Sequence, residues 1–173
     1  MRPLISITPQ MIASAIRRAP EVAVKRTKTS NYDTVYGLLG EYCFAQWLFN
    51  DWEGHSKIDT KGQIDFLNRI EVKTSAFPFS DKLNLLVRED YAKKRKPDFY
   101  VQTIIDLPSR ANQKIHPNTI CVLAGYATNI DVEDAPLKDF GSKFGGPGGY
   151  RCKYIRIDHL KPVEELKSIF KLN

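Results

Sequence analysis

One apolar stripe between residues 31 and 52 constrains the fold of this chain more than any other feature. Six apolar side chains recur there at intervals of three and four residues, which is the spacing of one face of an α-helix. They are Val35, Leu38, Tyr42, Ala45, Phe49 and Trp52. A helix with such a face must bury it against other elements. An earlier segment, residues 6–19, predicts a shorter helix, with Thr8 as a suitable N-cap, Pro9 at the first helical position and Met11, Ile12 and Ile16 as its apolar residues.

Segments typical of β-strands follow the long helix. They are short, rich in Ile, Val, Phe and Tyr, and separated by polar residues or by Gly and Pro. They cover residues 55–60, 62–67, 69–75, 82–88, 98–106, 119–127 and 151–157. Residues 160–173 predict a closing helix with Pro162 near its start. Because no linker or repeat divides the chain, we expect a single domain over residues 1–173, of the α/β class, with a central mixed β-sheet flanked by helices.

Composition and charge limit the partners that this chain can have. It has 173 residues, of which 42% are hydrophobic and 27% are charged, as in folded globular proteins. No apolar run approaches the roughly 18–20 residues that span a bilayer, and the N-terminus lacks the apolar core of a signal peptide. We therefore expect a cytoplasmic protein with no membrane partner. The net charge of +6 favours a polyanion such as nucleic acid.

The segment GQIDFLNRIEVKTS, residues 62–75, places charged side chains inside an apolar strand pattern. Taking a charge out of water is unfavourable unless the charge is paired or bound to a metal. Glu71 and Lys73 project from the same face of one strand, with Val72 opposite. The place of Asp65 depends on the hairpin register: a two-residue turn sets it opposite Val72, and a three-residue loop sets it opposite Glu71.

With the three-residue loop, residues 67–69, the carboxylates of Asp65 and Glu71 would lie roughly 5 Å apart across the strands. Like charges this close repel each other unless a cation lies between them. Mg²⁺ fits such a place because it takes one or two carboxylates and completes its shell with water and phosphate oxygens. Lys73 could then orient or deprotonate an attacking water, or neutralise charge that builds on a phosphate. Only this register builds a site.

The order of these residues resembles the core of the PD-(D/E)XK nuclease superfamily. In that superfamily a helix carrying an acid precedes a strand with Asp and a strand with Glu-x-Lys. The matching residues are Gly40-Glu41, Ile64-Asp65 and Glu71-Val72-Lys73 followed by Thr74-Ser75. The resemblance covers about residues 31–105 and implies a restriction-endonuclease-like core. Ile64 stands where the name-giving proline would be. The literal Pro97-Asp98 follows the Glu-x-Lys and begins a strand, so we interpret it as structural.

By this resemblance Asp65 and Glu71 would be metal ligands, Lys73 the catalytic lysine, and Glu41 a helix acid that binds or orients a metal. The backbone carbonyl of Val72 would also face the ion. The implied activity is hydrolysis of DNA phosphodiester bonds with Mg²⁺, or with Mn²⁺ in its place, by an endonuclease in preference to an exonuclease. A twofold homodimer would suit the cutting of both strands of a duplex.

Other interpretations stay open from the sequence. The hairpin charges can form an ion pair on a solvent-facing edge, worth under about 1 kcal/mol. The fold can serve as a DNA-binding or assembly module without catalysis, and composition is equally compatible with an RNA-directed nuclease. A small-molecule enzyme or an interaction domain is a further alternative. That last alternative predicts a Glu41 carboxylate far from those of Asp65 and Glu71.

Overall fold

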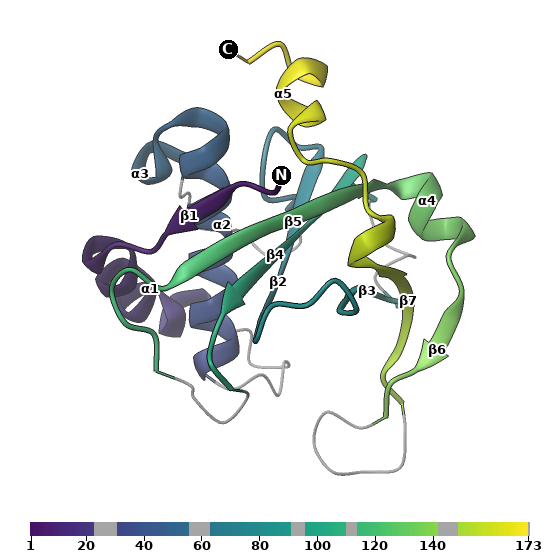
Figure 1. The fold of residues 1–173 in the computed structure, drawn as a ribbon, viewed down its shortest axis with the longest axis horizontal. Helices are drawn as coiled ribbons and strands as arrows, with labels where there is room; N and C mark the ends of the chain where they lie inside the picture. The colour runs from purple at the N-terminus through teal and green to yellow at the C-terminus, as the bar shows by residue number, and fades with distance from the viewer. Residues whose placement is uncertain (23–30, 56–62, 91–95, 110–113, 142–148, 173) are drawn as a thin grey trace.

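The computed structural model describes residues 1–22, 31–55, 63–90, 96–109, 114–141 and 149–172 (Figure 1). It is an α/β fold with two β-sheets. The α/β class predicted from the sequence is therefore confirmed. The strand predicted at residues 55–60 lies outside the described residues except for His55, which ends a short helix. Among the described helices, none is long and apolar enough to cross a membrane.

A four-stranded mixed sheet forms the centre of the molecule, in the order β1-β5-β4-β2. Its strands are β1 (Leu4–Ser6), β5 (Ile120–Thr128), β4 (Phe99–Asp106) and β2 (Ile70–Phe77). β2 runs parallel to β4, and the other pairs are antiparallel. The register places Glu71 beside Tyr100 and Lys73 beside Gln102. β2 is an edge strand of this sheet. Residues 65 and 66 lie along its free edge, where Phe66 pairs with Ile70.

A second, antiparallel sheet has the order β3-β7-β6. Its strands are β3 (Asn84–Arg88), β7 (Arg151–Arg156) and β6 (Leu137–Asp139). Leu85 and Val87 of β3 pack in one buried cluster with Tyr100 of the first sheet. Tyr100 and its neighbour Glu71 point to the same face of the first sheet. The second sheet therefore covers the face that carries Glu71 and Lys73.

Helices cover the opposite face of the first sheet. They are α1 (Pro9–Val22), α2 (Asn31–Phe49) and α3 (Trp52–His55). The N-cap prediction for α1 is confirmed, since the Thr8 hydroxyl accepts the Met11 N–H at 3.2 Å. Ile16, which we expected on the apolar face of this helix, is 59% exposed, and Ala15 and Ala19 are buried instead.

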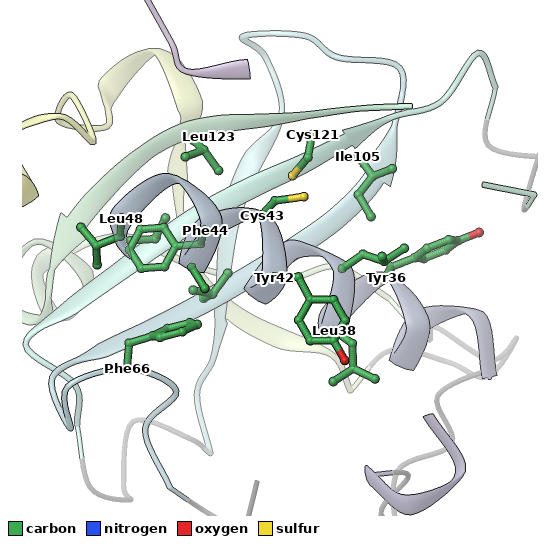
Figure 2. Close-up of a cluster of buried hydrophobic side chains, with 14 of the residues drawn as sticks. Tyr36, Leu38, Tyr42, Cys43, Phe44, Leu48, Phe66, Ile105, Cys121 and Leu123 are labelled. Atoms are coloured by element: carbon green, nitrogen blue, oxygen red, sulfur yellow. The ribbon is translucent and has the colours of Figure 1, made fainter. Parts of the chain in front are cut away.

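The core lies between α2 and the sheet, where buried side chains of the helix meet strands β4 and β5 (Figure 2). Leu38, Tyr42 and Ala45 of the predicted stripe are buried. The buried face is wider than the stripe, because Leu39, Cys43, Phe44 and Leu48 are buried too. Cys43 and Cys121 point toward one another in this core, and Cys43, Cys121 and Cys152 are all buried free thiols.

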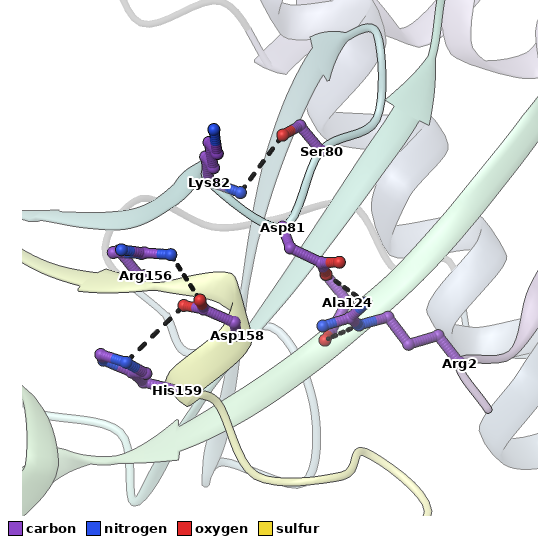
Figure 3. A network of polar contacts seen from close by, with 8 residues as sticks. All are labelled: Arg2, Ser80, Asp81, Lys82, Ala124, Arg156, Asp158 and His159. Atoms are coloured by element: carbon purple, nitrogen blue, oxygen red, sulfur yellow. Dashed lines mark hydrogen bonds and ion pairs between the residues drawn. The ribbon is translucent and has the colours of Figure 1, made fainter.

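Short elements complete the fold. They are α4 (Asn129–Asp134), the 3₁₀ helix η2 (Ile157–His159) and α5 (Glu165–Ile169). Arg2 joins distant segments, because its Nε donates to the Ala124 carbonyl at 2.9 Å and its guanidinium pairs with Asp81 at 2.5 Å (Figure 3). In η2, Asp158 pairs with Arg156 at 2.5 Å and lies 3.8 Å from His159. Arg2 thus ties the segment before β3 to β5, whereas the Asp158 contacts are local to the end of β7 and η2.

Candidate active site

The loop between Asp65 and Glu71 has the three-residue length on which the predicted site depends. Phe66 and Ile70 face each other across it, and each backbone N–H donates to the other's carbonyl, at 3.0 and 2.9 Å. One step outward from this pair, Asp65 lies opposite Glu71. Our expectation of a full strand over residues 62–67 is wrong within the described residues, since Phe66 alone pairs there.

Backbone conformation explains the length of the loop. Leu67 and Asn68 both have positive φ angles, 51° and 60°. Asn adopts this left-handed region readily, whereas Leu does so at some cost. Leu67 is nevertheless 48% exposed, so its side chain gains little from burial in return. The loop is therefore held in shape by contacts outside itself.

Arg69 supplies those contacts. Its carbonyl accepts the N–H groups of Asp98 and Phe99, at 2.8 and 3.0 Å. Its guanidinium forms an ion pair with Asp98 and lies 5.5 Å from the ring centre of Phe99 and 5.1 Å from that of Phe170. The loop is thus fixed to the start of β4 and to the C-terminal segment. Asp98 of the literal Pro97-Asp98 has the structural role that we predicted for it.

Asp65 closes the outer edge of β2 with its side chain. Its Oδ2 accepts the backbone N–H of Val72 at 2.7 Å. The N–H and carbonyl of one strand residue point to the same edge, so the Val72 carbonyl faces this edge as well. Asp65 is only half-buried as a residue, but its carboxyl group points inward. The candidate backbone ligand and the candidate carboxylate therefore share one edge of the sheet.

Three of the predicted site residues act on the carboxyl group of Asp65. Burial raises the pKa of this carboxyl well above its ordinary value of 3.8, and the negative charges of Glu41 and Glu71 raise it further. The hydrogen bond from Val72 and the ammonium of Lys73 lower this pKa in part. Electrostatic effects of this kind fall off with distance. The charges of Glu41, Glu71 and Lys73 thus all act on Asp65, and hydrogen bonds join Asp65 to Val72 and Lys73 to Glu71.

Glu71 and Lys73 form an ion pair on the face of β2 that the second sheet covers. The Lys73 Nζ donates to Glu71 Oε1 at 2.7 Å, and the two side chains are 28% and 25% exposed. Both charges act on the phenol of Tyr100. Burial raises the pKa of this phenol, the charge of Lys73 lowers it in part, and the charge of Glu71 raises it. The pair is thus partly open to solvent beside the first sheet's tyrosine.

Glu41 reaches the site because the helix before it lies very close to the sheet. A Cβ atom on Gly40 would lie 2.0 Å from the Thr74 hydroxyl and 2.6 Å from that of Thr103, so a side chain there would clash. One turn after Glu41, the ring of Phe44 lies 5.3 Å from that of Phe66 in an edge-on contact. The Gly-Glu pair on the helix is therefore a packing requirement as well as a motif.

Three further polar residues lie on the elements that carry the candidate site or next to them. The Ser75 hydroxyl accepts from the buried Gln102 amide at 3.4 Å, so it belongs to the interior between the strands. Gln46 donates to the Asn50 side chain at 3.1 Å on the exposed side of α2, away from the site. Tyr100 was not identified from the sequence, because its place beside Glu71 follows only from the pairing of β2 with β4.

The donor set was compared with the needs of a divalent cation. Within the described ranges, no group of three or more His, Cys, Asp or Glu side chains is arranged to hold a metal ion. The chemistry of the donors fits, however, because carboxylate and carbonyl oxygens are the ligands that Mg²⁺ and Mn²⁺ take. Three acids around Lys73 also leave a negative charge that a cation would offset. Binding therefore requires half-buried side chains to turn toward one another.

A cavity of about 460 Å³ lies elsewhere, between β5, α4 and β7. Two cationic residues that line it already have partners, since Lys161 pairs with Asp131 at 2.5 Å and Arg156 with Asp158 at 2.5 Å. None of the acids around Lys73 lines it. The carboxyl group with the strongly raised pKa, Asp65, thus lies outside the cavity. Because strongly shifted pKa values gather at functional sites, we place the candidate active site at the edge of β2.

A scan against protein-family models, a search of curated proteins and a search of solved structures each found no match to this chain. A functional proposal therefore has to rest on the residues and on their geometry.

Proposed function

We propose that this protein is a metal-dependent nuclease with a restriction-endonuclease-like core, which hydrolyses phosphodiester bonds in DNA. One observation carries the proposal: the three-residue loop sets Asp65 opposite Glu71, with Glu41 near enough to raise the pKa of Asp65. The alternative of a small-molecule enzyme or interaction domain predicted Glu41 far from this pair. The geometry supports the nuclease instead.

The roles follow from the chemistry of the side chains. Asp65 and Glu71 would hold Mg²⁺ or Mn²⁺, with Glu41 and the Val72 carbonyl as further ligands. A bound divalent cation supplies a Lewis acid for the phosphate and lowers the pKa of a bound water. Lys73 now pairs with Glu71, and a turn of that carboxylate toward Asp65 leaves the ammonium to face a phosphate. There it can hold an attacking water or stabilise charge in the transition state.

The choice of substrate rests on two separate arguments. The net charge of +6 supports a polyanionic partner and predicts binding that weakens with salt. The preference for DNA over RNA and for endonuclease action comes from the superfamily resemblance, and the homodimer follows from the cutting of both strands of a duplex.

A cleavage assay tests the proposal directly. Supercoiled, linear, branched and single-stranded DNA, and an RNA of matched sequence, are incubated with Mg²⁺, Mn²⁺ or EDTA. We expect DNA cleavage that requires the metal and that falls by about 10²-fold or more in Asp65→Asn and in Lys73→Met.

The matched control is Asp81→Asn, which neutralises an exposed aspartate that pairs with Arg2 away from the candidate site and should cut as the wild type does. The proposal is wrong if the wild type cuts none of these substrates, or if Asp65→Asn cuts as fast as wild type. Binding without cutting would support the non-catalytic DNA-binding module, and cutting of RNA alone would support the RNA-directed nuclease.

A further inference from the structure

The second sheet brings two further side chains to the Glu71 end of β2. Leu83, just before β3, packs near Ile104, whereas Val87 packs against Tyr100. β3 therefore runs back along the first sheet toward the level of Glu71, which pairs with Tyr100. Arg88 ends this strand, so its guanidinium lies at the same end of the molecule as the candidate active site.

Arg88 and Tyr150 form a pair there. The guanidinium carbon of Arg88 lies 5.8 Å from the centre of the Tyr150 ring. Arg88 also makes two hydrogen bonds to Asp90, Nε to Oδ1 at 3.0 Å and Nη2 to Oδ2 at 2.7 Å. These contacts hold the guanidinium in one orientation. Asp90 is exposed, and an ion pair of this kind is weak, so a phosphate can compete for the same donors.

Tyr150 is near enough to the candidate catalytic lysine for the charges of Lys73 and Arg88 both to act on its phenol. Burial and the neighbouring Cys152 thiol, which shares a hydrogen bond with the phenol, raise the pKa of Tyr150, while those two charges lower it in part. The phenol thus stays protonated in the neutral pH range, and its O–H would turn from the Cys152 thiol to a phosphate oxygen, which is the stronger acceptor. A guanidinium, a phenol O–H and an ammonium in succession are donors suited to consecutive phosphates of one strand.

We propose that Arg88 and Tyr150 bind a backbone phosphate of the substrate strand, next to the phosphodiester that faces Lys73. This inference rests on the proposed function and extends it, because it names the second sheet as the wall that holds the strand. The contact would be independent of base sequence, since phosphates carry no sequence information. Arg88 would give charge-dependent affinity, and Tyr150 a hydrogen bond without charge.

The test compares Arg88→Gln and Tyr150→Phe with a matched control, Arg151→Gln. Arg151 is an exposed arginine on β7 next to Tyr150, and it pairs with Glu89 at 3.2 Å in the way that Arg88 pairs with Asp90. Labelled DNA is titrated by fluorescence anisotropy in Ca²⁺ at several salt concentrations, and kcat and KM are measured in Mg²⁺. Thermal melting confirms that each variant folds.

We expect Arg88→Gln to weaken binding about 10-fold and to reduce the slope of log Kd against log salt by about 0.7–0.9. Tyr150→Phe should raise KM about 3–10-fold with the salt slope and kcat unchanged. Arg151→Gln should alter neither.

If the wild type cuts DNA but Arg88→Gln keeps the wild-type slope, or loses no more than Arg151→Gln, the phosphate site is wrong and the nuclease stands. If the wild type binds DNA with the Arg88-dependent slope but does not cut, the phosphate site stands and the nuclease is wrong. A wild type that does not bind DNA overturns both.

Discussion

Asp65→Asn should make the metal-free protein more stable while removing its proposed activity. Asn has the size of Asp, and its side-chain carbonyl can still accept the Val72 N–H that Asp65 accepts at 2.7 Å. The hairpin register should therefore survive. The substitution removes an inward-pointing negative charge that lies near Glu41 and Glu71.

The size of the effect follows from Coulomb's law. Two unit charges about 5 Å apart at an effective dielectric constant of about 20 repel by about 3 kcal/mol. Lys73 attracts Asp65 and offsets much of the repulsion from Glu71, which leaves the desolvation of the carboxylate and the repulsion from Glu41. We expect a gain of about 1–3 kcal/mol in the free energy of unfolding at neutral pH without metal, and each kcal/mol should raise Tm by about 2–4 °C.

The gain should depend on pH in a defined direction. Since the fold raises the pKa of Asp65 above 3.8, the native state holds this proton more tightly than the unfolded chain does. Stability of the wild type therefore falls as the pH rises from about 4 through the raised pKa, and Asp65→Asn lacks this fall. The difference between the two proteins should be small near pH 4 and complete above the raised pKa.

Urea unfolding in EDTA, at several pH values from about 4 to about 8, measures this difference. Asp98→Asn is the control, because its carboxylate pairs with Arg69 near the surface and its loss should give no gain. Saturating Mg²⁺ should stabilise the wild type, by about 2.7 kcal/mol at 100 times its Kd, and leave Asp65→Asn unchanged. The reasoning fails if Asp65→Asn is less stable than wild type at pH near 8 in EDTA, or if the difference does not vary with pH.

Two further substitutions test how the fold positions the site. Gly40→Ala should lower the free energy of unfolding by about 1–3 kcal/mol in urea titrations, because its Cβ would lie 2.0 Å from the Thr74 hydroxyl. Gly37→Ala is the control, since no atom lies within 4 Å of its Cβ, and it should raise the free energy of unfolding by up to about 1 kcal/mol. An equal effect at the two glycines would contradict the close approach of α2. Arg69→Gln should lower kcat and raise the Mg²⁺ concentration needed for half-maximal cleavage, because the loop that sets Asp65 opposite Glu71 loses its anchor. If Arg69→Gln folds and needs the same Mg²⁺ concentration as the wild type for half-maximal cleavage, the Arg69 contacts do not position the site and this prediction is wrong.

The sequence predicted the parts of this fold that depend on periodicity. The interval of three and four residues identified α2, and the apolar runs identified β2, β4 and β5. The alternation of side chains in a strand also placed Glu71 and Lys73 on one face. It left two registers for Asp65, because the choice depends on positive φ angles at Leu67 and Asn68 and on an anchor that reaches across to β4.

Features that depend on distant contacts were not predicted. β1, β6 and α4 are three to six residues long, too short to give a periodic pattern. Arg88 ends β3 and Tyr150 directly precedes β7, and nothing in their local sequence relates them to Lys73. Ile16 was assigned to the buried face of α1 because it is large and apolar, whereas Met11, Ala15 and Ala19 are the residues buried there.

The site lies at an edge strand, and Asp65 has two roles there. An unpaired strand edge exposes backbone N–H groups that can pair with another chain. The carboxylate of Asp65 accepts a hydrogen bond from one of these N–H groups, that of Val72, and so covers part of the edge. The proposed metal site requires the same edge to stay accessible. A carboxyl must lose its proton to become a metal ligand, so in the proposed nuclease cation binding and proton loss would be linked at this residue. The negative charges of Glu41 and Glu71, which raise the pKa of Asp65, make its carboxylate a source of instability without a cation and would attract a cation to it.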